Sequence, residues 1–132
     1  MIFVDTSFWA GLTARADARH EEAVELFTRY ADERLLTSNH VRGETWTFLR
    51  RRRGFRSAVS FLERVDRTSR LRVEFVSRGL EEEALRWLRQ REEREYSFVD
   101  ATSFALMRAL RVREAFAFDG DFAAAGFVEL RP

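Results

Sequence analysis

The sequence predicts an α/β fold in which helices cover both faces of a mainly parallel sheet. Short apolar runs alternate with longer amphipathic segments along the whole chain. The first run, residues 2–4, has no polar alternation, as expected of a strand buried on both faces. The intervening segments are long enough for the crossovers that parallel neighbours need. With 132 residues, 45% of them hydrophobic, we expect a single domain spanning residues 1–132.

Five strands are expected from the apolar runs. Residues 71–76 alternate between apolar and polar positions, and the other runs are more uniformly apolar. The expected strands are residues 2–4, 35–37, 71–76, 115–118 and 127–130.

Four helices are expected between the first three strands. Thr6 and Ser7 are expected to cap the first, and Gly54 is expected to stop the third where it follows a run of arginines. These helices are residues 8–12, residues 17–30, a segment that starts after Ser38 or Asn39 and ends at Gly54, and residues 57–65.

Three further helical segments are expected in the second half of the chain. They cover residues 80–91, residues 98–110 and a short turn or helix at 121–125. Ser97 is a suitable cap for the middle segment. No repeat, linker or low-complexity stretch divides these elements, which agrees with one domain.

The composition excludes several kinds of chemistry. Cysteine is absent, which removes disulfides, thiolate zinc sites and cysteine nucleophiles. All 23 basic residues are arginines, so there is no P-loop lysine, Schiff-base lysine or receiver-domain lysine. His20 and His40 lack metal-ligand spacing. The beginning of the chain does not read as a signal peptide, and no apolar stretch would cross a bilayer. We therefore expect a cytoplasmic protein without a membrane segment.

Four carboxylates fall where an α/β sheet places functional groups. Asp5 ends the first strand, Glu44 lies in the helix after the second strand, Asp100 opens a helix, and Asp119 follows the strand at 115–118. Ligands of open α/β sheets bind beyond the carboxyl ends of the strands, at the point where the strand order reverses. If these elements converge there, the acids share one pocket.

A shared pocket of carboxylates requires protons or a cation, because like charges repel strongly in a partly buried site. Ligation by oxygen alone favours Mg²⁺ or Mn²⁺ over Zn²⁺. Each acid also has an ordinary explanation when taken alone. Asp5 could be a turn or cap, Glu44 a solvated helix residue and Asp100 a partner of the helix dipole. Asp119-Gly120-Asp121 could be a simple turn.

Four short motifs, in order, resemble the PIN-domain ribonucleases, in particular the VapC-like toxins of type II toxin–antitoxin pairs. The resemblance covers the whole chain and depends on the order of the motifs more than on any one of them. The motifs are Ile2-Phe3-Val4-Asp5-Thr6-Ser7, Thr37-Ser38 with Glu44-Thr45, Phe98-Val99-Asp100-Ala101, and Ala117-Phe118-Asp119-Gly120-Asp121-Phe122 before Gly126-Phe127.

The resemblance implies a three-layer α/β/α sandwich and Mg²⁺- or Mn²⁺-dependent endoribonuclease activity. It also implies a homodimer and control by a small antitoxin protein. Carried over by position, Asp5, Glu44, Asp100 and Asp119 would form the catalytic and metal-binding quartet, with Asp121 as a further metal contact and Ser7 in support. The mechanism expected from these residues is in-line attack on phosphorus by a metal-activated water, with Glu44 either binding a second ion or orienting the water.

The arginine run Arg50-Arg51-Arg52-Arg53 lies outside the shared motifs and has no role assigned by them. It is either a solvated helix end or a contact for phosphate or an acidic partner. Two alternatives to a toxin remain open: a non-catalytic RNA- or protein-binding module on the same fold, and a housekeeping RNA-processing nuclease. Growth arrest on expression, relieved by the neighbouring open reading frame, would indicate a toxin.

Overall fold

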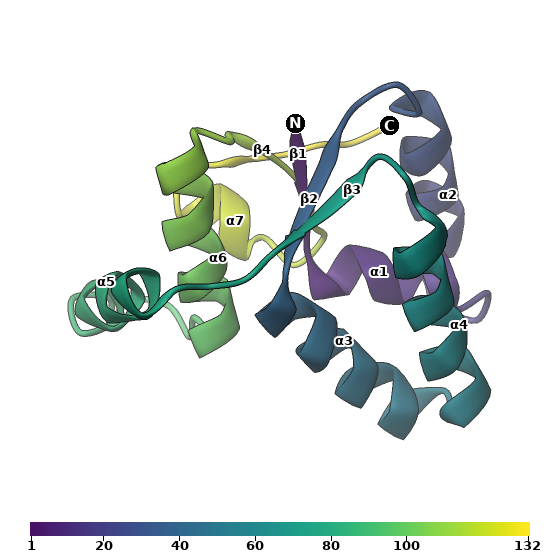
Figure 1. The fold of residues 1–132 in the computed structure, drawn as a ribbon, viewed down its shortest axis with the longest axis horizontal. Helices are drawn as coiled ribbons and strands as arrows, with labels where there is room; N and C mark the ends of the chain where they lie inside the picture. The colour runs from purple at the N-terminus through teal and green to yellow at the C-terminus, as the bar shows by residue number, and fades with distance from the viewer.

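The computed structural model describes residues 1–132 and places a five-stranded sheet at their centre (Figure 1). All four strand pairings are parallel, in the order β3-β2-β1-β4-β5. The expected sheet is therefore confirmed, and it is wholly rather than mainly parallel. The strands are β1 Ile2–Val4, β2 Leu35–Ser38, β3 Leu71–Glu74, β4 Glu114–Phe116 and β5 Val128–Glu129.

Helices lie on both sides of the sheet, which confirms the expected α/β/α sandwich. In Figure 1, α1, α2 and α4 lie on one side of the strands, and α5, α6 and α7 lie on the other. The helix α3 runs outward from the end of β2. The helices are α1 Thr6–Thr13, α2 His20–Arg29, α3 Asn39–Arg52, α4 Phe55–Arg67, α5 Arg78–Leu88, α6 Phe98–Leu110 and α7 Asp121–Ala124.

The strand β1 forms the centre of the sheet and of the core. Ile2, Phe3 and Val4 are fully buried, as their uninterrupted apolar sequence predicts. The chain builds outward from β1 to β2 and β3, then crosses to β4 on the other side of β1. The strand order thus reverses between β1 and β4, where Val4 is in register with Phe116. The residues that follow these two strands face the crevice where ligands of α/β sheets bind.

Several expected boundaries are wrong, and local hydrogen bonds explain the largest shifts. Asp5, rather than Thr6 or Ser7, caps α1, because its carboxylate accepts the Ser7 N–H and the helix starts directly at Thr6. Residues 17–19 form a turn instead of the first turn of α2, since the Asp17 carboxylate accepts the Arg19 N–H at 2.8 Å. Ser77 caps α5, which places the start of that helix at Arg78.

Other expected segments differ in length. The helix α4 starts at Phe55, directly after Gly54, whose φ of 97° suits glycine. The strand β4 ends at Phe116 because the Phe118 N–H is taken by the Ser7 hydroxyl instead of a neighbouring strand. The edge strands β3 and β5 are shorter than expected. None of the helices has the length and apolar character needed to cross a membrane.

Candidate active site

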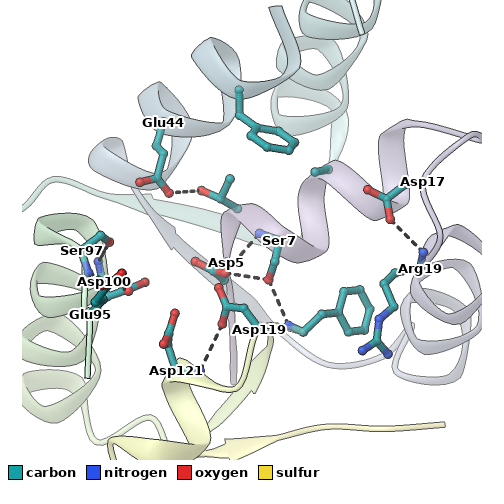
Figure 2. Close-up of a pocket in the computed structure, with 14 residues that line it drawn as sticks. Asp5, Ser7, Asp17, Arg19, Glu44, Glu95, Ser97, Asp100, Asp119 and Asp121 are labelled. Carbon is teal, nitrogen blue, oxygen red and sulfur yellow. Dashed lines mark hydrogen bonds between the residues drawn. The ribbon is translucent and has the colours of Figure 1, made fainter. Parts of the chain in front are cut away.

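A pocket of about 450 Å³ opens at the carboxyl ends of β1 and β4 and holds every acid singled out from the sequence. Figure 2 shows their side chains directed toward one hollow from separate elements. The acids that line it are Asp5, Glu44, Asp100, Asp119 and Asp121, together with Asp17 and Glu95. The predicted convergence of distant residues is therefore present.

Asp5 is the most deeply buried of these acids. Its side chain is 3% exposed, and its Oδ2 accepts hydrogen bonds from the Ser7 hydroxyl at 2.7 Å and the Ser7 N–H at 3.1 Å. Burial, followed by the nearby charge of Asp119, raises the pKa of Asp5 to about 8, despite the Ser7 bonds that favour the anion. Without a cation, the folded protein therefore holds a proton on Asp5 at neutral pH.

Ser7 fixes the geometry between the two strands that carry the site. Its hydroxyl donates to Asp5 and accepts the Phe118 N–H at 3.0 Å, although residues 7 and 118 lie 111 positions apart. One side chain thus joins the start of α1 to the segment that leads from β4 to Asp119. Ser7 therefore links Asp5 to that segment, and its support of a metal shell, which the resemblance implies, stays a prediction.

Asp100 is held by a reciprocal cap at the start of α6. The Ser97 hydroxyl accepts the Asp100 N–H at 2.9 Å, and the Asp100 carboxylate accepts the Ser97 N–H at 3.0 Å. Burial raises the pKa of Asp100 to about 6, and the charges of Asp121 and Asp119 add to that rise. The cap explains the orientation of the Asp100 side chain, and the raised pKa means that its surroundings disfavour the charged carboxylate.

Asp119 and Asp121 come from the tight turn between β4 and α7. Gly120 has a φ of 84°, which lets the chain fold back so that Asp119 Oδ1 accepts the Asp121 N–H at 3.2 Å. Burial also raises the pKa of Asp119. Oxygens from Asp100, Asp119 and Asp121 all lie within 4.8 Å of one another, a spacing that one metal ion could span.

Glu44 approaches the same pocket from α3, opposite the aspartates (Figure 2). Its Oε1 accepts a hydrogen bond of 2.7 Å from the Thr6 hydroxyl. The Thr6 hydroxyl in turn lies 3.1 Å from the Thr45 hydroxyl, which donates to it. Thr6 therefore links the Glu44 carboxylate to the first turn of α1, immediately after Asp5.

Sequence reasoning missed Thr6 as a support for Glu44, and it missed Arg94 altogether. Arg94 Nε forms an ion pair of 2.6 Å with Asp121 Oδ1, and its Nη2 donates to the Asp119 carbonyl at 3.2 Å. Thr6 lies 38 positions from Glu44 and Arg94 lies 27 positions from Asp121. No short motif marks either pair. Thr6 was read only as a helix cap, and Arg94 stands in a charged stretch, residues 91–95, that resembles any solvated loop.

The donor set fits a hard divalent cation. Asp100, Asp119 and Asp121 offer only carboxylate oxygens, the ligands that Mg²⁺ and Mn²⁺ prefer, and no histidine or cysteine lines the pocket. The raised pKa values of Asp5, Asp100 and Asp119 show that their charge lacks sufficient compensation from the protein. A cation among them would supply that compensation. The two histidines instead make ordinary contacts: His20 with the Gly11 carbonyl and His40 with Glu81.

Comparison with known proteins identifies the class to which this fold and pocket belong. The PIN domain family matches residues 2–128, and the chain belongs to that family. The chain is 56% identical, over its full length and 99% of the relative, to proteins named 23S rRNA-specific endonuclease VapC20 from two strains of Mycobacterium tuberculosis. A crystal structure of M. tuberculosis VapC20, described as a sarcin–ricin loop cleaving toxin, superposes with a TM-score of 0.92 at 54% identity and covers both chains completely.

These relatives confirm the predicted family and the predicted enzyme class, an endoribonuclease of the toxin–antitoxin kind. The identity extends over the whole chain, so the similarity includes the segments between the four short motifs as well as the motifs themselves.

Proposed function

We propose that the chain is the toxin of a toxin–antitoxin pair and cuts RNA with the help of a divalent cation held by its aspartates. The observation that carries the proposal is the meeting of Asp5, Asp100 and Asp119 in one pocket, each with a raised pKa. Carboxylates arranged in this way lower the stability of the metal-free protein, and such an arrangement is typical of functional sites.

Asp100, Asp119 and Asp5 would hold the cation, Mg²⁺ or Mn²⁺, and Asp121 would add a further contact. When bound, the ion supplies a more acidic water and steadies the leaving oxygen of the phosphodiester. Hydrogen bonds from Ser7 and Ser97 fix the carboxylates of Asp5 and Asp100, and these bonds would limit their motion when they hold an ion. Glu44, on the opposite wall, accepts a hydrogen bond from Thr6, and it would either orient the attacking water or bind a second ion.

The substrate proposed for this chain is 23S ribosomal RNA at the sarcin–ricin loop. The names of the relatives support this choice, since the chain shares more than half of its residues with them along its whole length. We further propose that the protein is a single domain, acts in the cytoplasm as a homodimer and is inhibited by a small antitoxin. A housekeeping nuclease or an inert binding module is less well supported, because all the acids are present and the named relatives are endonucleases and a toxin.

Cleavage of total RNA with Mg²⁺, Mn²⁺ or EDTA, followed by mapping of the new ends, tests the proposal. The Asp5→Asn variant should lose cutting while keeping its fold, because the amide keeps the shape of the carboxylate but not its charge. Asp66→Asn, an exposed change in α4, is the matched control and should cut normally. Cutting by Asp5→Asn at the rate of the unaltered protein would show that the site assignment is wrong. Induced expression with and without the neighbouring open reading frame tests the toxin assignment.

A further inference from the structure

A second hollow continues from the active-site pocket along α3. Its volume is about 500 Å³, and it shares Glu44 and Phe48 with the first pocket. Its remaining wall consists of His40, Gly43, Thr47 and Val99. Since two residues line both hollows, a ligand whose reacting group sits among the aspartates would extend into this second space.

Apart from Val99 on α6, the wall of the second hollow is one face of α3. Residues 40, 43, 44, 47 and 48 recur at the three- and four-residue spacing of a helix face. The next position on that face is Arg51, which is exposed. The face therefore passes from the catalytic acid Glu44, through the aromatic ring of Phe48, to the arginine run at the end of the helix.

Phe48 has the properties of a platform for stacking. Its side chain is 37% exposed although it is a large apolar residue. The Arg52 guanidinium lies 5.4 Å from the centre of its ring, and Arg50 lies 5.8 Å from the ring of the next exposed aromatic residue, Phe55. Exposed rings interleaved with arginines are the combination with which proteins hold single-stranded nucleic acid.

The charge of this end of the molecule is uncompensated. The run Arg50-Arg51-Arg52-Arg53 and the nearby Arg56 form no ion pair with any acid of the chain, whereas Arg19, Arg29, Arg67, Arg72, Arg94, Arg108 and Arg131 do. A polyanion is the partner that this surface complements, because each phosphate bound releases counterions from the nucleic acid.

We propose that this hollow is a nucleobase subsite, in which a base next to the scissile phosphate stacks on Phe48 while the strand continues over the arginine run. The inference rests on the proposed function, since it takes RNA as the ligand of the adjoining pocket. It assigns the arginines a role in holding phosphates, and it assigns Phe48 a role in positioning the strand.

Gly43 offers a direct way to fill the hollow. It is exposed on α3, and a Cβ added there would meet nothing within 4 Å. Gly43→Leu would therefore project a side chain into the space proposed for the base without a clash, and leucine favours the helix more than glycine does. Gly43→Ala is the matched control, because a methyl group leaves most of the space open.

The test is RNA binding in the cleavage-inactive Asp5→Asn background, with a labelled single-stranded RNA oligonucleotide of mixed sequence as the probe. We expect Phe48→Ala and Gly43→Leu each to weaken binding about tenfold, as when the stacking of one base is lost. Phe75→Ala is the control, since Phe75 is 65% exposed beneath an arginine, Arg42, but lines neither hollow. It should bind RNA as its parent does.

The arginines should differ from Phe48 in their response to salt. Arg51→Gln should reduce the dependence of log Kd on log salt concentration by about 0.7, the contribution of one phosphate contact in single-stranded RNA. Phe48→Ala should leave that slope unchanged, because stacking releases no counterions. Arg29→Gln, on α2, is the control for a general change of charge.

Equal affinities of the Phe48→Ala and Phe75→Ala variants would overturn the proposal, as would failure of the Asp5→Asn parent to bind the probe. If Phe48→Ala left RNA binding unchanged but weakened self-association or antitoxin binding, the hollow would be a protein-docking surface. That result would also overturn the subsite proposal. Mn²⁺ binding by chains with Asp5 intact, measured by calorimetry, separates the two proposals. Normal Mn²⁺ binding by the unaltered chain and by Phe48→Ala, together with unchanged RNA binding by the Phe48 variant, would mean that only the subsite is wrong. No Mn²⁺ binding by the unaltered chain would count against the proposed function.

Discussion

The two walls of the active-site pocket are built on different principles. The aspartate wall, Asp5, Asp100, Asp119 and Asp121, consists of residues at the ends of strands and the starts of helices. The carboxylates of Asp5, Asp100 and Asp119 accept hydrogen bonds from residues close in sequence, and that of Asp121 pairs with the distant Arg94. The α3 wall presents Glu44 from the body of a helix, held by a hydroxyl from another element. Asp5 and Asp100 are buried, Asp121 and Glu44 are half-buried and Asp119 is exposed, and the pKa values of Asp5, Asp100 and Asp119 are raised.

Under the proposed function, the two walls have different roles. The cation is assigned to the aspartate wall, where the pKa values of Asp5, Asp100 and Asp119 are raised. Glu44 accepts a hydrogen bond from a neutral hydroxyl and lies across the hollow, and the proposal assigns it a role toward water or substrate. Four experiments test whether the two walls have these separate roles.

The largest effect is expected on metal binding. Asp119→Asn should weaken Mn²⁺ binding by at least about 100-fold, because removing a direct ligand has a larger effect than removing a residue that only orients one. Glu44→Gln should change it less than tenfold while still slowing cleavage. Isothermal calorimetry measures both variants. A larger loss of affinity in Glu44→Gln than in Asp119→Asn would place the ion on the α3 wall.

The second effect concerns pH. The unfolded chain has an ordinary aspartate pKa near 3.8, and folding raises that of Asp5 to about 8, so the folded state binds the extra proton between these values. Stability of the metal-free protein should therefore fall as the pH rises from about 4 to 8, by up to about 4 kcal/mol between pH 5 and 9. Asp100, whose pKa is raised to about 6, adds a change of the same sign.

Urea unfolding in EDTA at several pH values measures that change. In Asp5→Asn the decline should be much smaller, and the variant should be more stable than the unaltered protein at pH 8. An identical decline in both proteins would mean that Asp5 is not the group that titrates.

A smaller effect is expected at the link between the walls. Thr6→Val removes the hydrogen bond to Glu44 and should lower the free energy of unfolding by about 1 kcal/mol and slow cleavage. The same change at Thr13, on the same helix, is the control, because the buried Thr13 hydroxyl has no hydrogen-bond partner. Thr13→Val should be neutral or stabilising. Thermal melting compares the two, and equal destabilisation would show that the Thr6 bond contributes nothing specific.

The smallest change, in Mn²⁺ affinity, is expected for Arg94 at the rim of the aspartate wall. Arg94→Gln removes the cation that pairs with Asp121, so Mn²⁺ should bind slightly more tightly, by less than tenfold. Arg89→Gln, at the end of α5, is the control for the change in total charge. Weaker Mn²⁺ binding in Arg94→Gln would instead mean that Arg94 orients Asp121 for the metal.

Much of the fold could be predicted from local patterns. The buried strand at residues 2–4 follows from its apolar run, and the start of α6 follows from Ser97, which caps it as expected. The boundaries that were wrong lie where side chains compete with regular structure. Asp5, and not Thr6 or Ser7, caps α1, and the turn at Asp17 makes α2 start later in the sequence than expected.

The site acids were predicted from their places in the expected strands and helices together with the family resemblance, and their meeting in one pocket was stated only on the condition that those elements converge. Their roles as catalytic and metal-binding residues stay a prediction. The orientation of each acid could be predicted only in part, because a cap such as Ser97 with Asp100 is encoded within four residues. The contacts of Glu44 with Thr6 and of Arg94 with Asp121 join segments far apart in the sequence, and no sequence motif links the two segments of either pair.

The sequence by itself determined which elements form and which carboxylates stand at their ends, because helix periodicity, strand burial and capping depend on residues close together in the chain. Contacts between distant parts of the chain determine that Ser7 links Asp5 to the segment after β4 and that burial raises the pKa of Asp5 to about 8. The tertiary structure also places Phe48 between the acidic pocket and the second hollow along α3. Burial and charge repulsion depend on every atom that surrounds a group, and those atoms come from all parts of the chain.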